Sequence, residues 1–511
     1  MKEKIKKHKS PIIIFILLTF GIIVLSGVFS FLGVQAEYST INTVTNKLNN
    51  NVVQADNILS GSGIKSLVVN TVNDFVNFTP FSMLLIILIG FGILEKSGFL
   101  KTGFTLLTQH VKKNTITFML VFLCLMFSML GNIGFVVMIP LCALLFKYGK
   151  RNPLGGIILA FASLSFGQCV NLFISAIDSN MMSLSTNTAR MLDPKYLINP
   201  YFKLFVMIVA LLLFAFMFTY ITEKVIMTKL NKGSEDEIED IKVSNKELRG
   251  LIVGLGVGCL YVVIIAYFII PGLPLSGLLL DNTATLYVDK LLGANSFFNQ
   301  GFIFIVTILF ILVGFFYGIF AKTIKSSKDV TDSFGASLDG IGNTIVLIFF
   351  ASIFINVFKM TNIGTVISAF LATVLSSLNF TGVGLIIILF IFAIISGLFN
   401  PSTVGAWAIF SGSAVPTFMN ASISPEFAQL VFTFGNCALK GLTPLFSFFI
   451  IYLAFAQKYD NREGNVFVNS IKNMLPYAAC TIVICFVLVV GWYITGLPIG
   501  INTLPGVTYA A

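Results

Sequence analysis

The stretch TFGNC at residues 433–437 decides the fold, because a close copy of it, SFGQC, stands at residues 165–169. The two copies are 268 residues apart (433 minus 165), and the same interval separates Asn132 from Asn400. Each of these four sites interrupts a long apolar run. One interval that is shared by two pairs of interrupted apolar segments predicts an internal repeat.

The composition places these segments in a membrane. Of 511 residues, 56% are hydrophobic and 11% are charged, and the mean hydropathy is +0.94. Many apolar runs approach the ~20 residues that a helix needs to cross a bilayer. A β-barrel would instead show alternating segments of about ten residues. We therefore predict an all-α polytopic membrane protein.

The charge of the chain indicates orientation rather than a nucleic-acid partner. The net charge is +10, but the Lys and Arg residues cluster beside the apolar runs, which is typical of cytoplasmic loops. The basic start MKEKIKKHKS precedes an apolar run that is too long for a signal peptide. We expect an uncleaved first helix, a cytoplasmic N-terminus and a multi-pass protein of the cell membrane, in contact with lipid.

Metal and cofactor chemistry is not indicated. The seven cysteines all lie in apolar segments without a CxxC spacing, and the two histidines, His8 and His110, lie in basic flanking segments. These patterns argue against a disulfide framework or a zinc site. The phosphate-binding pattern GxxxxGK[ST] does not occur, which argues against direct ATP drive. We expect no cofactor.

The apolar runs and their basic flanks predict about nine transmembrane helices and two re-entrant hairpins. Single helices are expected near 11–35, 79–95, 203–222, 250–270, 298–321, 341–358 and 473–495, and two interrupted ones at 153–178 and 426–456. The chain then divides into a first helix and external loop (1–78), a first repeat (79–222) with a hairpin at 115–146, a charged cytoplasmic loop and connecting helices (223–346), a second repeat (347–495) with a hairpin at 383–418, and an external tail (496–511).

The two repeats should have opposite orientations. Lys and Arg flank the first hairpin on both sides, so it should enter from the cytoplasm, whereas the second hairpin lacks such flanks and should enter from outside. Inverted repeats with broken helices are typical of secondary transporters, in which the breaks meet near the middle of the membrane and hold substrate and ions.

Over nearly its whole length the chain resembles the AbgT (p-aminobenzoyl-glutamate transporter) family. The resemblance rests on GNIGFVVMIPLCALLFKYGKRNPLGG (131–156), NVFKMTNIG (356–364) and, most specifically, NPSTVGAWAIFSGSAVPTF with the SPEFAQLVFTFGN and LTP that follow it (400–444). It implies nine helices with two hairpins, a homodimer, and ion-driven transport of aromatic amides.

The chain departs from this family at positions that matter for chemistry. The family pattern has an acidic residue where this chain has Asn132, a serine where it has Val404, and an arginine and an aspartate where it has Thr433 and Asn436. Asp178, Trp407 and Pro425 match the pattern. The resemblance therefore carries the architecture further than the substrate or the coupling chemistry.

Lys440 is the candidate residue that stands out most, because apolar residues continue on both sides of it. Intramembrane ammonium groups mark substrate or ion pathways, although a lysine near an interface can also extend its charge into water. Three roles are open: pairing with an anionic substrate, occupying a cation site so that sodium is not needed, or carrying the coupling proton. Asp178 is the expected counter-charge and a second coupling candidate; otherwise it ends a helix at the outer interface.

The remaining candidates are polar groups at the tips and breaks and residues of the family pattern. Amides there can bind a carboxylate or an ion, or can cap the half-helices. Trp407 could stack on an aromatic ligand or anchor at an interface. The substrate-binding candidates are Asn132, Gly134, Gln168, Asn171, Asp178, Asn400, Ser402, Thr403, Trp407, Pro425, Thr433, Asn436 and Lys440.

These features favour a secondary active transporter over other functions. It would carry a small anionic or amide-bearing solute by alternating access, coupled to protons rather than sodium because the tips lack acids. A dicarboxylate or amino-acid carrier is the nearest alternative. An intramembrane enzyme would need paired aspartates, a buried histidine or a metal cluster, and none is indicated. A channel would show one continuous pore, whereas a carrier should bring both tips and both breaks around a small cavity.

Overall fold

The computed structural model describes residues 10–42, 47–230, 243–293, 295–378, 380–460, 462 and 464–506. The basic N-terminal segment with His8, the middle of the charged loop and the end of the tail lie outside the described residues, so their expected placements are not tested.

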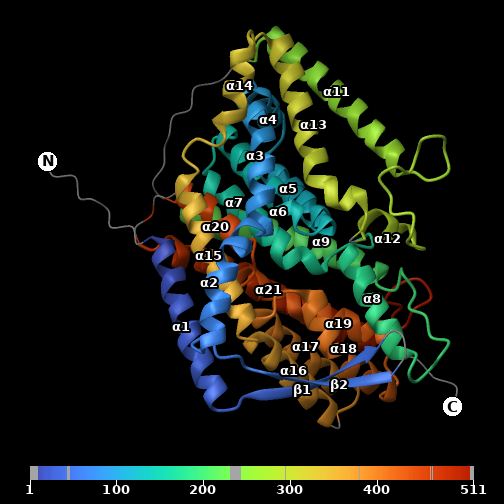
Figure 1. Ribbon diagram of the computed structural model, residues 1–511. Helices are drawn as coiled ribbons and strands as arrows, with labels where there is room; N and C mark the ends of the chain where they lie inside the picture. The colour runs from blue at the N-terminus through green and yellow to red at the C-terminus, as the bar shows by residue number, and fades with distance from the viewer. Residues whose placement is uncertain are drawn as a thin grey trace.

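The described chain is almost entirely helical, as predicted (Figure 1). Within it, nine helices are long and apolar enough to cross a membrane: Pro11–Phe31, Gly61–Ser97, Lys113–Leu130, Leu204–Leu230, Asn245–Ile269, Phe297–Ala321, Gly342–Met360, Gly382–Phe399 and Val466–Thr495. The number agrees with the sequence prediction, but two members differ. One arm of each hairpin is counted here, and the two interrupted helices are too short on either side of their breaks.

Both predicted hairpins are present. In the first, α5 (Lys113–Phe127) and α6 (Ile133–Tyr148) are joined by a 3₁₀ turn and by Gly131, whose φ of 63° favours glycine. In the second, α17 (Gly382–Phe399) ends before Asn400 and α18 (Thr403–Asn420) begins after Ser402. Pro401 keeps Asn400 out of the helical region, and the Ser402 hydroxyl caps α18 through the N–H of Gly405.

Both predicted helix breaks are also present. The first broken helix consists of α7 (Pro153–Phe166) and α8 (Ala176–Ala189), with a 3₁₀ turn at Gly167–Cys169 between them. The second consists of α19 (Pro425–Cys437) and α20 (Phe449–Tyr459), with a 3₁₀ turn at Lys440–Leu442. Arms of 11 to 14 residues reach only about 17–21 Å at 1.5 Å per residue, so each ends inside a bilayer core of about 30 Å.

The order of elements repeats along the chain. The first set is α3 (Thr79–Ser97), α4 (Phe99–His110), the first hairpin, the first broken helix and α9 (Leu204–Tyr220), and the second is α15 (Gly342–Met360), α16 (Ile363–Ser377), the second hairpin, the second broken helix and α21 (Val466–Thr495). Each start agrees with the 268-residue interval to within six residues. The opposite orientation of the two sets across the membrane stays a prediction.

The other elements frame these two sets. They are α1 (Pro11–Phe31), α2 (Gly61–Val76), a π-helical stretch (Ile221–Ile226) that continues α9 into α10 (Met227–Leu230), α11 (Asn245–Ile269), α12 (Tyr287–Leu292), α13 (Phe297–Ala321) and α14 (Ser327–Ala336). Helix α13 packs against α3 and α11. In the cap of α14, hydrogen bonds from the backbone N–H groups of Lys325 and Ser326 favour the charged form of Asp329 and lower its pKa.

A β-hairpin within the polar stretch 36–78 was not predicted. Strand β1 (Gln35–Asn42) pairs antiparallel with β2 (Lys47–Gln54), and this ribbon lies along α16 and α18 at one end of the molecule, opposite α14 (Figure 1). Gly412 of α18 permits the contact, because a side chain there would meet the carbonyl oxygen of Ser39 at 2.0 Å. The ribbon therefore ties the start of the chain to the second hairpin.

Candidate functional site

A cavity of about 410 Å³ lies where the two hairpin tips and the two helix breaks meet. The first tip contributes Asn132, the first break Gln168 and the second break Lys440. The second tip contributes Asn400, Pro401, Ser402 and Thr403. The volume of this cavity is within the range of small-molecule binding sites. The convergence expected of a carrier is therefore observed.

Lys440 lies at the centre of this arrangement. It is 1% exposed, and its Nζ donates to Gln168 Oε1 at 2.6 Å and to Thr403 Oγ1 at 2.7 Å. The Nζ atom also lies 5.9 Å from the centroid of the Phe446 ring. No carboxylate in the described part of the chain lies within ion-pair distance of it. The positive charge is thus held by neutral dipoles from both repeats.

Two hydrogen-bond chains extend from Lys440 to the tips. Toward the second tip, Thr403 Oγ1 donates to Asn436 Oδ1 at 2.8 Å, and Asn436 Nδ2 donates to the carbonyl oxygen of Asn400 at 3.4 Å. Toward the first tip, the carbonyl oxygen of Gln168 accepts from Asn171 Nδ2 at 3.2 Å, and Asn171 Oδ1 accepts from Ser128 Oγ at 2.9 Å. The amides therefore connect all four interrupted segments.

The cavity has a positive lining. The described residues that line it include Lys440 and Lys359 and no aspartate or glutamate. Lys359 ends α15 and is exposed, unlike Lys440. Four phenylalanines supply apolar walls: Phe358, Phe399, Phe446 and Phe448. Such a lining suits an anionic ligand that also carries an apolar or aromatic part.

Asn132 also faces a second, smaller cavity. This space of about 340 Å³ lies between the first tip, the start of α8 and α13. Asn132 and Ile177 line both cavities. The exposed amide at the first tip therefore stands between two spaces and makes none of the cap bonds that the sequence allowed for it.

The expected pairing of Asp178 with Lys440 is wrong. Asp178 Oδ1 instead accepts from Lys203 Nζ at 2.5 Å, and both residues are buried. Its other oxygen accepts from the backbone N–H and the hydroxyl group of Ser175, which completes a capping box at the start of α8. In the sequence, Lys203 stands between a loop and an apolar run, like the basic residues that flank membrane helices. Nothing in that position indicates that it pairs with Asp178.

Trp407, Thr433 and Pro425 do not line the cavity. Trp407 is fully buried, its Nε1 donates to Ser185 Oγ of α8 at 2.8 Å, and its ring packs on Phe432. It thus neither anchors at an interface nor faces an open space. Thr433 Oγ1 donates to the carbonyl oxygen of Gln429. Pro425 is the first residue of α19.

Gly134 has a packing role. A side chain there would meet Leu164 at 2.9 Å and the carbonyl oxygen of Phe127 at 3.2 Å, so glycine lets the first hairpin close against α7.

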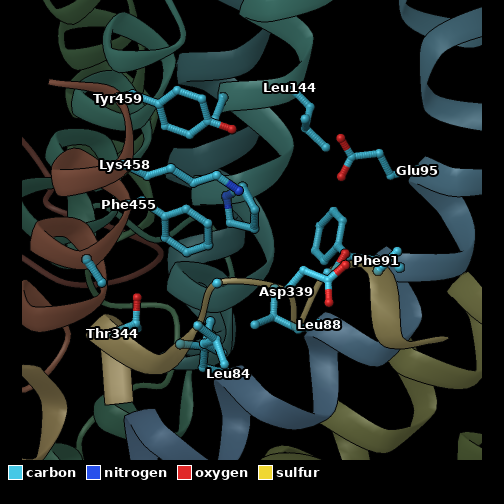
Figure 2. A pocket seen from close by; sticks show the side chains of 18 of the residues that line it. Leu84, Leu88, Phe91, Glu95, Leu144, Asp339, Thr344, Phe455, Lys458 and Tyr459 are labelled. Carbon is cyan, nitrogen blue, oxygen red and sulfur yellow. The ribbon is translucent and has the colours of Figure 1, made fainter. Parts of the chain in front are cut away.

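A larger cavity of about 770 Å³ lies farther along the same elements, toward α14. Figure 2 shows Lys458 and Tyr459 of α20 on one side of it and Glu95 of α3 on the other, with Leu84 and Leu88 below. We assign the substrate site to the smaller cavity, because both tips and both breaks line that one and none of them lines the larger one.

An aromatic layer separates the two cavities. On α6 the smaller cavity begins at Asn132 and the larger one at Pro140, a rise of about 12 Å. Between them Phe135 is 1% exposed and lies 5.2 Å from Phe446 and 5.1 Å from Phe448, measured between ring centroids. The two cavities share no lining residue, and these packed rings lie between them along the first hairpin.

Comparison with known proteins agrees with this architecture. The family model described as "AbgT putative transporter family" matches residues 3–507. The chain belongs to the AbgT family. The p-aminobenzoyl-glutamate transport protein of Escherichia coli K12 is 25% identical to it over 502 residues, which cover 98% of this chain and 95% of that protein.

Two solved structures are also similar to this AbgT-family chain. The YdaH transporter of Alcanivorax borkumensis, described as having an unusual topology, is 24% identical with a TM-score of 0.49, over 96% of this chain and 100% of that one. MtrF of Neisseria gonorrhoeae, described among antimetabolite efflux pumps, is 26% identical with a TM-score of 0.48, over 98% of both chains.

Family membership makes the chain a multi-span membrane transporter and not an enzyme. Within this AbgT-family transporter, sequence reasoning found Lys440 and the four amides of the network. It missed Ser128, Lys359 and the phenylalanines of the cavity wall, because a serine, a flanking lysine and phenylalanines are common throughout such a chain.

Proposed function

We propose that this AbgT-family protein is a secondary active transporter of a small organic anion with an aromatic or amide-bearing part. The cavity between the tips and breaks is its substrate site, and a molecule like p-aminobenzoyl-glutamate is its substrate. The observation that carries the proposal is the lining of that cavity, whose charged residues in the described chain are two lysines.

The cavity favours an aromatic anion over a simple dicarboxylate. Lys359 and the field of Lys440 suit either ligand, but the four phenylalanines offer apolar surface that a small dicarboxylate would leave unused. A dicarboxylate or amino-acid carrier stays the alternative that the two lysines alone would support.

Transport by alternating access is part of the proposal. The layer formed by Phe135, Phe446 and Phe448 lies between the substrate cavity and the larger one, so we expect a rearrangement of the hairpins to join them. We propose a proton gradient rather than a sodium gradient as the driving force, because no aspartate or glutamate of the described chain lines the cavity and an ammonium group, that of Lys440, stands in it. The homodimer, the cell-membrane location and the cytoplasmic N-terminus stay predictions.

The experiment is uptake of p-aminobenzoyl-glutamate into proteoliposomes that contain the full chain. Proton and sodium gradients are imposed separately, and empty liposomes are the control. Uptake that follows the proton gradient and is inhibited by aromatic carboxylates is expected. Inhibition by aliphatic dicarboxylates alone would favour the alternative carrier, and equal flux without any gradient would indicate a channel.

A further inference from the structure

We propose that the space between Gln168 and Thr403 is a monovalent-cation site that the chain fills with its own Lys440 ammonium group. The inference deepens the proposed function, since a site that is occupied permanently from within leaves sodium no role in transport. Its first test does not depend on the identity of the solute.

The ammonium group is bound as a coordinated cation would be. It donates to two neutral oxygen atoms, Gln168 Oε1 at 2.6 Å and Thr403 Oγ1 at 2.7 Å, and its Nζ lies 5.9 Å from the centroid of the Phe446 ring. Both oxygen ligands are neutral, and no carboxylate of the described chain lies within ion-pair distance. A site without a carboxylate suits a singly charged ion better than Mg²⁺ or Ca²⁺, whose protein ligands include carboxylates.

Helix ends supply the negative potential that a carboxylate would otherwise give. Helix α7 and its 3₁₀ turn end at Cys169, next to Gln168, and α19 ends at Cys437, three residues before Lys440. The carboxyl end of a helix carries about half a negative charge. In transporters with broken helices, such ends and the unwound backbone coordinate the coupling cation. Two of them converge here on a lysine.

The ligands come from both repeats and from a tip. Gln168 belongs to the first break, Thr403 to the second tip and Lys440 to the second break, so occupancy of the site links elements that a transport cycle must separate and rejoin. Because the lysine is covalently attached, its effective concentration at the site is far above that of a free ion. External sodium cannot displace it and cannot deliver energy through it.

The first test measures thermal unfolding of the purified full chain in detergent. Wild type, Lys440→Ala and Lys359→Ala are compared in sodium, potassium or choline chloride at one ionic strength. Lys359→Ala is the matched control, since it removes the other cavity lysine and leaves the cation site intact. The unfolding midpoint of wild type should be the same in all three salts, and so should the midpoint of Lys359→Ala.

Lys440→Ala should unfold earlier in choline and should regain stability, saturably, in sodium or potassium, because a ligand that binds only the folded state raises its stability with concentration. A Lys440→Ala midpoint that is equal in all three salts would overturn the inference, as would a sodium-specific rise in wild type. If Lys440→Ala cannot be purified, Lys440→Ser takes its place with the same two outcomes.

The second test is uptake into proteoliposomes. Uptake by Lys440→Ala should depend on sodium. It should be about tenfold higher in sodium than in choline if occupancy of the cation site rises from about one-tenth to nearly full. Uptake by wild type should be the same in both salts. Sodium-driven uptake by wild type would overturn the inference. Absence of uptake by every variant would count against the proposed solute, and the unfolding measurement would still decide the cation site.

Discussion

The buried pair of Asp178 and Lys203 allows a quantitative test of the structure. We consider Lys203→Met, Asp178→Asn and the double variant. Removing one partner of a buried ion pair leaves an uncompensated charge and costs about 3–5 kcal/mol, whereas replacing both partners by neutral groups costs much less.

The contacts of the pair refine these values. After Lys203→Met, the Asp178 carboxylate keeps its two bonds from Ser175, so a loss near the lower end, about 3 kcal/mol, is expected. After Asp178→Asn, the buried ammonium loses its counter-charge and α8 loses part of its cap, so the loss should lie near the upper end, about 5 kcal/mol. The double variant should lose about 1–2 kcal/mol, as when only a cap is impaired.

The assay is equilibrium unfolding by dodecyl sulfate in mixed micelles, followed by tryptophan fluorescence. Trp407 reports on the same region, because its indole group donates to Ser185 of α8. Lys195→Met is the control: Lys195 is an exposed lysine in the loop before α9, and its replacement should stay within about 0.5 kcal/mol of wild type.

This double-mutant cycle can also refute the pairing of Asp178 with Lys203. With these values, the sum of the two single losses (about 8 kcal/mol) should exceed the double loss (about 1–2 kcal/mol) by about 6–7 kcal/mol, which is the coupling between the two charges. Single losses below about 1 kcal/mol that add within about 0.5 kcal/mol would mean that the two charges are not paired. Asp178 would then be available to Lys440, and the coupling role expected for it from the sequence would regain its physical basis.

Three further predictions follow from single contacts. Thr403→Val should impair the proton-driven uptake of the proposed solute, whereas Thr403→Ser should preserve it. Only a hydroxyl group can both accept from Lys440 and donate to Asn436, and loss of a bond to a charged group costs about 1.5–3 kcal/mol. Equal uptake by both variants would contradict this prediction. Lys359→Gln should raise KM about fivefold with kcat unchanged, since an exposed charge contributes about 1 kcal/mol to binding of the substrate anion. Added salt should reduce this difference in KM, and a difference that does not depend on salt would contradict the prediction. Gly397→Ala should destabilise the protein by about 1–3 kcal/mol, because a side chain there would meet the carbonyl oxygen of Asn436 at 2.3 Å. Gly491→Ala is the control: this glycine lies in open space on α21, so the substitution should be neutral or stabilising. The same unfolding assay measures both variants.

The elements that could be predicted from the sequence are those with local chemical signals. Proline and glycine favour interruptions such as those at Pro401 and Gly131, and an isolated charge such as Lys440 is visible in any apolar run. The β-ribbon was missed because residues 36–54 are mostly polar and show no clear alternation, so its burial against Gly412 is decided by a helix far along the chain.

The parts of the site that could not be predicted depend on long-range partners. Lys203 resembles a flanking charge until its distance to Asp178 is known. Trp407 suggested a ligand or an interface, but its partner, Ser185, comes from a helix in the other repeat. Lys359 ends α15 in sequence and lines the cavity only because α16 turns back against the second tip, where Gly364 lies close to the carbonyl oxygen of Phe399.

The departures from the family pattern now have a common physical interpretation. The resemblance places an arginine at Thr433, inside α19, whereas here the threonine bonds to its own helix and the positive charge stands beyond the helix end, at Lys440. At that place the ammonium donates to Gln168 and to Thr403, so the protein itself already binds this charge. Direct recognition of the anion then falls to Lys359. Substitutions at Lys359 should therefore change substrate affinity, and substitutions at Lys440 should change the cation dependence. A chain in which Lys440 bound the substrate itself would show the first effect at both positions.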